Sequence, residues 1–492
     1  MTSAAADLSR IADPNAPRDR SALITFDGQA ELENITYGEL DGRIEDVAAR
    51  LRSIGCGAGS PVALLGETSA ATMIVSLGIM RAGGVLVSIN HKLPIVDQEK
   101  IIRHSECDLL IHSELFADSI PGNIRSSLSF EELVAAVSAD NQLSPADRAM
   151  IMYTSGSSGT PKGVPLTHDG YLWAMERFDF LGEVIRGRAT LIAAPLFHMN
   201  GQFHALSVLM LGGTAVMLPT FSAATYLDAA RNYEAARLTG VPTMFELCAR
   251  HIEQTDGEPI TSVLSVGMGS APFAPSLIDR LQAVFPNATI SNGYGTTEIG
   301  PATFGPHPDG LATPQTSIGY PMPGVETRLR GRPSSDQGEL LMKTGMQTKG
   351  YLGRPDLTDK VFDNGWYTTG DIMRRDEDGF FFFEGRVDDM FVSGGENIHP
   401  ASVERTVLSH PSVKEVAVVP LEDPMKGAVP VAFVVGDVDP DELKSFSLEH
   451  GPAYAHPRFI EVMSELPLAG TNKIDRRALK SRAAERFGGL RS

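Results

Sequence analysis

The first part of the chain alternates short apolar runs with longer segments that have helical periodicity. The apolar runs have the length of buried strands and occupy residues 61–65, 151–154, 189–195, 214–219, 263–266 and 289–294. Such alternation over a long chain is typical of α/β layers whose sheets are largely buried. We therefore predict an α/β fold with a large N-terminal domain of layered sheets.

The pattern changes twice toward the C-terminus. Residues 319–383 are rich in Gly, Pro, Thr and Asp between short strand-like runs, which predicts a small β-rich subdomain. After residue 388, a helix at 399–408 and strands at 415–419 and 430–434 predict a compact α+β unit. We divide the chain into an N-terminal domain of residues 1–387 and a small, mobile C-terminal domain of residues 388–492.

Composition narrows the classes of partner. The 492 residues contain 42 Lys and Arg and 61 Asp and Glu, a net charge of −19, which disfavours nucleic acid and anionic membranes as partners. Three scattered cysteines, Cys56, Cys107 and Cys248, fit buried thiols in a reducing compartment. The N-terminus lacks the pattern of a signal peptide, and no apolar segment is long enough to span a bilayer. We predict a cytoplasmic protein that does not insert into membranes, and leave open whether it forms a homodimer.

A run of hydroxyl and glycine residues at 153–163 is the strongest chemical signal. Small side chains let backbone N–H groups converge on phosphate oxygens, hydroxyls add donors, and one lysine adds charge, so the run predicts ATP binding. It is not the usual P-loop, because Pro161 replaces the second glycine and Gly163 follows the lysine. A flexible linker is the alternative, but apolar strand-like residues flank the run. The candidate ligands are Thr154, Ser155, Gly156, Ser157, Ser158, Gly159, Thr160 and Lys162.

Further motifs follow in a fixed order: APLFH at 194–198, NGYGTTE at 292–298, GWYTTGD at 365–371, GRVDD at 385–389, and Asn472-Lys473. Together with the phosphate loop, they closely resemble the adenylate-forming superfamily of acyl-CoA synthetases, nonribosomal adenylation domains and luciferases. Ordered motifs of this number are specific. Within that superfamily, residues 385–404 look most like bacterial acyl-CoA and aryl-CoA ligases.

The nucleotide residues can be argued from their chemistry and from the resemblance together. Tyr294 offers a flat face for adenine, and its glycine neighbours let the backbone approach the ring. Glu298 is the kind of oxygen ligand that Mg²⁺ prefers. The resemblance implies that Thr297 meets the α-phosphate and that Asp371 and Arg386 bind the ribose. The nucleotide set outside the phosphate loop is Asn292, Gly293, Tyr294, Gly295, Asp371 and Arg386.

The resemblance also implies the remaining roles. Lys473 is expected to be the catalytic lysine that stabilises charge during adenylation, although Asn472 stands where the family has glycine. Asp388 matches the hinge between the domains. Gly394 and Gly395 would line a tunnel for the pantetheine arm of CoA, because absent side chains leave room for it.

The acid pocket is assigned by the same resemblance. His198 would stand at its wall, as a gate or an orienter of the carboxylate. None of the pocket residues is charged at neutral pH apart from a protonated histidine, so a dicarboxylate has no obvious counter-ion among them. Gly293 and Gly300 are expected to leave volume, which favours an aromatic acid or a medium or longer fatty acid over acetate. The pocket set is His198, Met199, Asn200, Ser270, Gly293, Gly300 and Pro301.

We therefore predict an ATP- and Mg²⁺-dependent acid–CoA ligase. It would join a carboxylic acid to AMP with release of pyrophosphate and then transfer the acyl group to the thiol of CoA, with positioning and charge neutralisation doing most of the work. The alternatives are an adenylating enzyme that loads a separate carrier protein, a luciferase-like oxygenase, and a non-enzymatic ATP-binding regulator.

Overall fold

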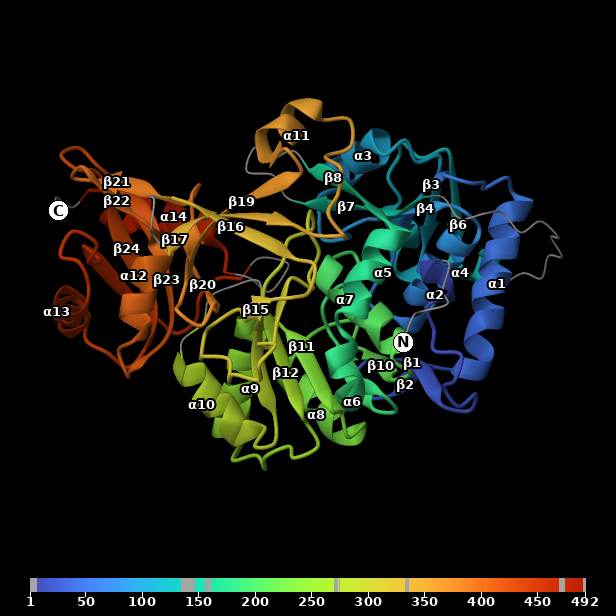
Figure 1. Ribbon diagram of the computed structural model, residues 1–492, viewed down its shortest axis with the longest axis horizontal. Coiled ribbons are helices and arrows are strands. Elements are labelled where there is room, and N and C mark those ends of the chain that lie inside the picture. Colours follow the sequence, from blue (N-terminus) through green and yellow to red (C-terminus); the bar gives the residue numbers. More distant parts are fainter. Residues whose placement is uncertain are drawn as a thin grey trace.

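The structure is a computed structural model of the chain. It describes residues 7–133, 147–154, 161–269, 273, 275–331, 336–468 and 474–489. A large part built from the first two thirds of the sequence lies beside a smaller part built from the C-terminal residues (Figure 1). This mixed α/β architecture, with a large N-terminal domain of layered sheets and a smaller C-terminal domain, confirms the predicted fold class.

The first of two largely parallel sheets has the strand order β13-β12-β11-β9-β10-β1-β2. Only its edge pair, β1 with β2, is antiparallel among the pairings of this sheet in the described residues. The strands are β1 (Ser21–Phe26), β2 (Glu31–Thr36), β9 (Ala189–Ile192), β10 (Thr214–Met217), β11 (Arg237–Gly240), β12 (Ser265–Gly269) and β13 (Thr289–Gly293).

The second parallel sheet has the order β6-β5-β3-β4-β7-β8 and contains the phosphate-loop hairpin. Strand β7 pairs in parallel with β4 and antiparallel with β8, so Thr154 lies opposite Lys162. Its strands are β3 (Pro61–Leu65), β4 (Val85–Ser88), β5 (Leu109–His112), β6 (Ser126–Ser129), β7 (Arg148–Thr154) and β8 (Lys162–Thr167).

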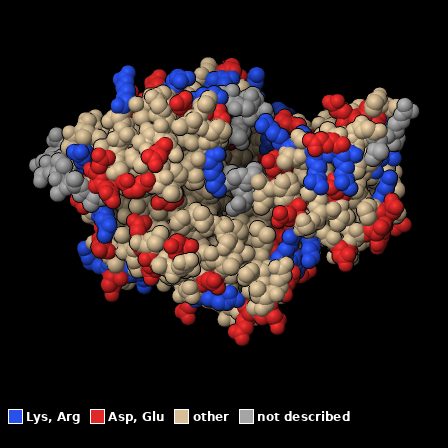
Figure 2. All heavy atoms as spheres, turned by 180° about the vertical axis from the view of Figure 1, so that it is seen from behind, with Lys and Arg blue, Asp and Glu red and all other residues tan. Residues whose placement is uncertain are grey.

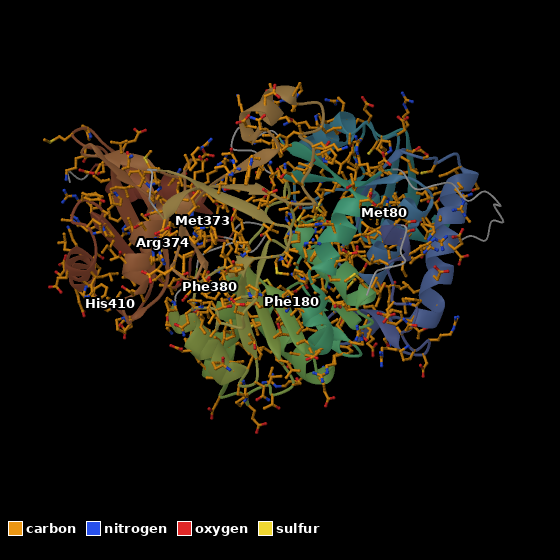
Figure 3. The ribbon with its side chains drawn as sticks, viewed as in Figure 1. Met80, Phe180, Met373, Arg374, Phe380 and His410 are labelled. Atoms are coloured by element: carbon orange, nitrogen blue, oxygen red, sulfur yellow. The ribbon has the colours of Figure 1, made fainter. Side chains whose placement is uncertain are left out.

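Helices cover both sheets, and their apolar faces pack against the strands and bury them. The helices of this part are α1 (Tyr37–Ser53), α2 (Ala70–Arg81), α3 (Ile95–His104), α4 (Phe130–Leu133), α5 (His168–Glu176), α6 (Gly182–Ile185), α7 (Met199–Met210), α8 (Ala223–Asn232), α9 (Pro242–Thr255) and α10 (Pro275–Val284). Short 3₁₀ helices occupy Leu8–Arg10, Glu114–Ser119 and Asp179–Leu181. One large cluster of buried side chains, to which Met80 belongs, lies between the two sheets (Figure 3).

An antiparallel sheet follows, as the turn-rich composition of residues 319–383 predicted. It consists of β16 (Glu326–Arg330), β17 (Gln337–Lys343), β18 (Phe362–Asp363), β19 (Trp366–Arg375) and β20 (Phe381–Arg386), next to the short pair β14 (Phe304–Gly305) and β15 (Tyr320–Pro321) and to α11 (Pro355–Val361). Side chains alternate across β19: Met373 is buried, whereas Arg374 stacks on the ring of Phe382 and pairs with Glu384 (Figure 3).

The C-terminal part has its own sheet and its own apolar clusters. Strands β23 and β24 form its long antiparallel hairpin, and β25 pairs with β24 in parallel. Its elements are β21 (Phe391–Ser393), β22 (Glu396–Ile398), α12 (Pro400–Leu408), β23 (Val413–Asp423), β24 (Gly427–Gly436), α13 (Pro440–His450), β25 (Phe459–Met463) and α14 (Arg476–Phe487).

The acidic surface and the buried thiols that the composition predicted are both present in the structure. Acidic side chains are spread over the face shown in Figure 2, with basic side chains interspersed among them. The three cysteines are unpaired and buried, and burial raises the pKa of Cys56 to about 11. Among the described helices, none combines the length and the apolar character that crossing a bilayer requires.

Helices α1 and α2 pack closely because Gly78 has no side chain. A Cβ atom at Gly78 would lie 2.4 Å from Cγ1 of Val47 and 2.6 Å from its Cβ. We expect Gly78→Ala to lower the free energy of unfolding by about 1–2 kcal/mol, because overpacking outweighs the gain in helix propensity. Gly42→Ala on α1 is the matched control, since a Cβ there meets nothing within 4 Å, and it should stabilise by about 0.5–1 kcal/mol. Equal effects of both changes in denaturant titration would contradict this view of the helix contact.

Candidate active site

The candidate nucleotide residues meet where the first parallel sheet adjoins the antiparallel sheet. Tyr294 follows β13, Asp371 lies on β19, and Arg386 ends β20 directly opposite Asp371 in register. The hydroxyl of Tyr294 donates to Oδ2 of Asp371 at 2.5 Å, and Nη1 of Arg386 donates to Oδ1 at 2.8 Å. Three residues that are separated in sequence therefore form one hydrogen-bonded unit.

Burial governs the protonation of this unit. Burial raises the pKa of Asp371, and the positive charge of Arg386 opposes that rise. Burial and then the Asp371 charge raise the pKa of Tyr294, so its hydroxyl keeps the proton that it donates. The turn is tight: the N–H of Asp371 donates to Oγ1 of Thr369, and Gly370 has a φ of +76° that favours glycine.

Glu298 and Lys162 come together around a residue that sequence reasoning missed. The ring of Tyr351 lies 5.2 Å from Nζ of Lys162, and its hydroxyl donates to Oε1 of Glu298 at 2.8 Å. Tyr351 belongs to no recognised motif, and nothing in the local sequence marks it. It joins the end of the phosphate hairpin to the candidate metal ligand.

The glycines of the NGYGTTE motif have different structural roles. A Cβ at Gly295 would lie 2.4 Å from the carbonyl oxygen of Gly300, so only glycine permits this backbone contact. Gly300 itself has a φ of +90°, and a Cβ there would meet Sδ of Met346 at 2.5 Å. The expectation that Gly300 leaves volume for the acid is therefore wrong, because Met346 fills that space. Gly293 is exposed, and of the residues that the structure describes only Met268, through its carbonyl oxygen, comes within 4 Å of a Cβ there.

The other assigned residues are placed as follows. Asn292 donates from Nδ2 to the carbonyl of Thr316 at 3.0 Å, which fixes the strand end. Thr297 is half-buried next to Glu298, and Pro301 is half-buried after Gly300. His198 caps α7 and lies against Phe197, with 4.6 Å between the ring centroids. Met199 is buried at the first position of α7, and Asn200 follows it.

Some assigned residues fall outside the described part of the chain. They are Ser155, Gly156, Ser157, Ser158, Gly159 and Thr160 of the phosphate loop, Ser270 of the acid pocket, and Lys473. Gly394 and Gly395 lie at the exposed tip of the β21–β22 hairpin with φ of +60° and +89°, as a two-residue turn of glycines requires. A Cβ at either position would meet no atom of the described residues within 4 Å.

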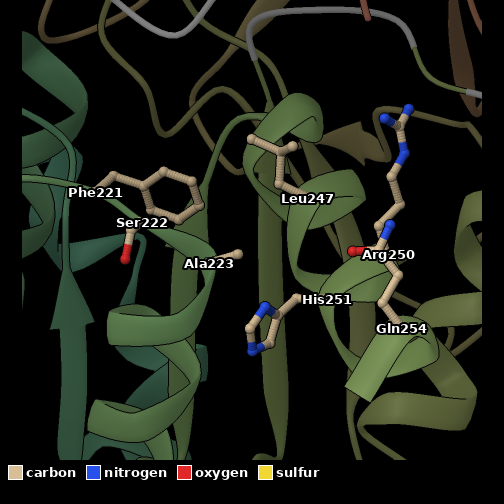
Figure 4. Close-up of a pocket in the computed structure, with 7 residues that line it drawn as sticks. All are labelled: Phe221, Ser222, Ala223, Leu247, Arg250, His251 and Gln254. Carbon is tan, nitrogen blue, oxygen red and sulfur yellow. The ribbon is translucent and has the colours of Figure 1, made fainter. Parts of the chain in front are cut away.

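A surface pocket lies apart from these residues, between the start of α8 and the side of α9 (Figure 4). Its side chains include Arg250, which also pairs with Glu415 on β23 and so connects α9 to the C-terminal part. None of the assigned site residues lines it. The lining residues are Phe221, Ser222, Ala223, Leu247, Arg250, His251 and Gln254.

The two-part fold and the ordered motifs place the chain among adenylate-forming enzymes. The sequence model of the AMP-binding enzyme family matches residues 12–352, and that of the AMP-binding enzyme C-terminal domain matches residues 402–473. The chain therefore belongs to the AMP-binding enzyme family, and the predicted resemblance is confirmed.

Relatives of known function extend over nearly the whole chain. A feruloyl-CoA synthase from an Amycolatopsis species is 31% identical over 92% of this chain and 94% of its own length. A 2-succinylbenzoate–CoA ligase from Bacillus licheniformis is 31% identical over 94% of this chain and 96% of its own length. Among solved structures, the o-succinylbenzoate CoA synthetase of Bacillus subtilis in complex with its acyl-adenylate intermediate has a TM-score of 0.80 at 26% identity, covering 94% of this chain and 95% of that one.

The Tyr294 hydroxyl gives a first test of the site. Tyr294→Phe keeps the ring face but removes the donor to Asp371, and hydrogen bonds to charged groups contribute about 1.5–3 kcal/mol. We expect the KM for ATP to rise about tenfold or more, with a smaller change in kcat. Tyr171→Phe is the control, because the one hydrogen-bond partner of the buried Tyr171 hydroxyl among the described residues is the sulfur of Met152, at 3.9 Å. An unchanged KM for ATP in Tyr294→Phe would separate this tyrosine from nucleotide binding.

Proposed function

We propose that this AMP-forming acid–CoA ligase activates an aromatic carboxylic acid. The enzyme class rests on the family match and on relatives that include a feruloyl-CoA synthase and a 2-succinylbenzoate–CoA ligase. In the first half-reaction, a carboxylate oxygen of the acid bonds to the α-phosphorus of ATP and pyrophosphate leaves, which yields acyl-AMP. In the second, the thiolate of CoA attacks the acyl carbon and AMP leaves.

The observation that carries the choice of an aromatic acid is the exposed glycine at the end of β13. Gly293 is exposed and has no side chain, and it lies directly opposite the buried Gly269 of β12 in register. Phe197 and Met199, at the start of α7, are apolar and nearly inaccessible. A planar ring can lie on exposed peptide backbone where a branched side chain would stand above it, so this surface favours a flat acid over a flexible chain.

The nucleotide roles follow from the contacts described above. The Asp371 carboxylate, held by Tyr294 and Arg386, is placed to accept hydrogen bonds from ribose hydroxyls. Lys162 supplies positive charge for the β- and γ-phosphates, and Thr297 lies next to the α-phosphate. Lys473 would neutralise charge between the acid and the α-phosphate, as the resemblance implies. Positioning and charge neutralisation then supply most of the rate enhancement.

Glu298 has the chemistry of a magnesium ligand. Its Oε1 accepts from Tyr351, and among the described residues no hydrogen-bond partner is bonded to Oε2. Mg²⁺ commonly binds through one or two carboxylates together with substrate phosphates, so a single buried carboxylate near Lys162 fits it. When bound, the ion would neutralise phosphate charge.

The two half-reactions require different groups at the same cleft. The antiparallel sheet ends at Arg386 and the C-terminal sheet begins at Phe391, with the exposed Asp388 between them. We assign the domain boundary at 387/388 and the hinge to Asp388. Rotation there would bring the exposed Gly394 and Gly395 to the pantetheine arm of CoA. We also assign the enzyme to the cytoplasm, where its thiols would stay reduced, and keep the homodimer as a prediction for size-exclusion chromatography.

The function is tested by pyrophosphate release with Mg-ATP across acetate, propionate, octanoate, palmitate, benzoate and amino acids, with and without CoA. We expect a CoA-dependent rise with benzoate. Release that ignores CoA would favour the second candidate, an enzyme that loads a separate carrier protein. A preference for octanoate or palmitate over benzoate would overturn the aromatic assignment.

Gly293→Val tests the site directly. The backbone at Gly293 has no positive φ, and the described residues leave room for a side chain there, so the variant should fold. The added branches would fill the surface proposed for the ring, and we expect kcat/KM for benzoate to fall at least tenfold while that for propionate changes less than threefold. An equal loss for both acids in ATP–pyrophosphate exchange would place Gly293 outside the acid pocket.

A further inference from the structure

One face of the first parallel sheet carries polar groups that the assigned functions do not use. Leu191, Leu238 and Val266 point to the opposite face and pack in the cluster beneath α8, α9 and α10. Because side chains alternate along a strand, Thr190, Arg237, Ser265 and Gly267 share the other face, on adjacent strands β9, β11 and β12. Helix α7 contacts β9 and β10 on that side and contributes Phe203 to the core between the sheets.

This face is partly open above β12 and β13. Gly267 is partly accessible, and Ser291, opposite it in register, is exposed. On α7, Asn200 and His204 are one turn apart and are both half-buried. Because side chains alternate along a strand, Gly267 and Gly269 of β12 lie on the same face of the sheet as Arg237 and as Gly293, at the proposed acid pocket.

Arg237 lies on β11, next to β12 on this face of the sheet. It is 4% exposed, and its Nη1 donates to Oγ of Ser265 at 2.6 Å. Its Nη2 lies only 3.0 Å from the position that a Cβ of Gly267 would take, so the guanidinium rests on the bare backbone of Gly267. Its Nε has no hydrogen-bond partner, and no carboxylate of the described residues pairs with it.

Two other buried polar atoms nearby also lack partners. Oγ1 of Thr190, on a residue that is 0% exposed and opposite Arg237 in register, has none among the described residues. The same holds for Oδ1 of Asn200 on α7. Unsatisfied buried polar groups are expensive and are rare in native proteins. Thr190 and Arg237, opposite each other on adjacent strands, therefore present two partnerless polar atoms on one face of the sheet, which indicates a site that is completed by a ligand.

The charge at this position is positive at neutral pH. Burial lowers the pKa of Arg237 to about 10, which still leaves it protonated. Burial and then the Arg237 charge lower the pKa of His204 to about 3, so this imidazole is neutral. Elsewhere the chain neutralises a buried arginine: Arg81, also nearly inaccessible, pairs with Asp41 at 2.9 Å and with Glu45 at 3.5 Å.

We propose that Arg237 is the distal counter-ion of the acid pocket, and that the preferred acid is an aromatic dicarboxylate whose second carboxylate binds this guanidinium. The inference rests on the proposed function, since it needs the acid to enter at Gly293. The guanidinium lies over Gly267, and Gly269, two residues further along the strand, is opposite Gly293. Two residues of strand span roughly 7 Å, so the two carboxylates of the acid belong at opposite ends of one ring. The sequence analysis found no obvious counter-ion for a dicarboxylate among the assigned pocket residues, and Arg237 lies outside that set.

The test compares benzene-1,4-dicarboxylate with 4-methylbenzoate, which has a similar shape but no distal charge, in ATP–pyrophosphate exchange. We expect the wild type to prefer the dicarboxylate. Arg237→Met should lower kcat/KM for the dicarboxylate at least 100-fold and change that for 4-methylbenzoate less than threefold, while Arg237→Lys should recover part of the loss. Arg81→Met is the matched control, because it removes a buried arginine that already has carboxylate partners and should affect both acids equally.

A second variant guards against misfolding of Arg237→Met. Gly267→Ala keeps the charge but crowds Nη2, and should lower kcat/KM for the dicarboxylate alone, about tenfold. A wild type that prefers 4-methylbenzoate, or an Arg237→Met variant that loses both acids equally, overturns the inference while leaving the proposed function intact. A wild type that activates no aromatic acid would instead defeat the proposed function.

Discussion

The buried carboxylate of Asp371 is the contact on which the rest of the site depends. It receives a hydrogen bond from Tyr294, at the end of the first parallel sheet, and one from Arg386, the last residue of β20. A carboxylate that is removed from water needs such donors, because burying it unpaired would cost several kcal/mol. These two hydrogen bonds hold three segments that are separate in sequence around the place proposed for the ribose.

Much of the fold and of the nucleotide site could be predicted from the sequence. Strand β3 occupies residues 61–65 as the apolar run there indicated, and the change of texture after residue 319 marks the antiparallel sheet. The strands could be found because their signal is local: a run of apolar residues bounded by turns. The Asp371–Arg386 pair could be anticipated because each residue lies in a recognisable motif.

What could not be predicted depends on neighbours that are distant in sequence. Met346 fills the space beside Gly300, and Tyr351 joins Lys162 to Glu298, yet neither residue carries a local signal. Arg237 begins an ordinary strand, and its importance is visible only when the glycines of the adjacent strand leave its guanidinium on bare backbone. A list of motif residues names the candidates for ATP binding, but it does not show which buried charges lack a partner.

The pairing of Thr154 with Lys162 has a consequence for the entropy of ATP binding. Because β7 and β8 are hydrogen-bonded up to this pair, the two ends of the intervening segment are already held together by the sheet. The entropy of closing that segment has been lost during folding, so it does not have to be lost again when the nucleotide arrives. Changes that fray the end of this hairpin should weaken ATP binding even though they alter no atom that touches the phosphates.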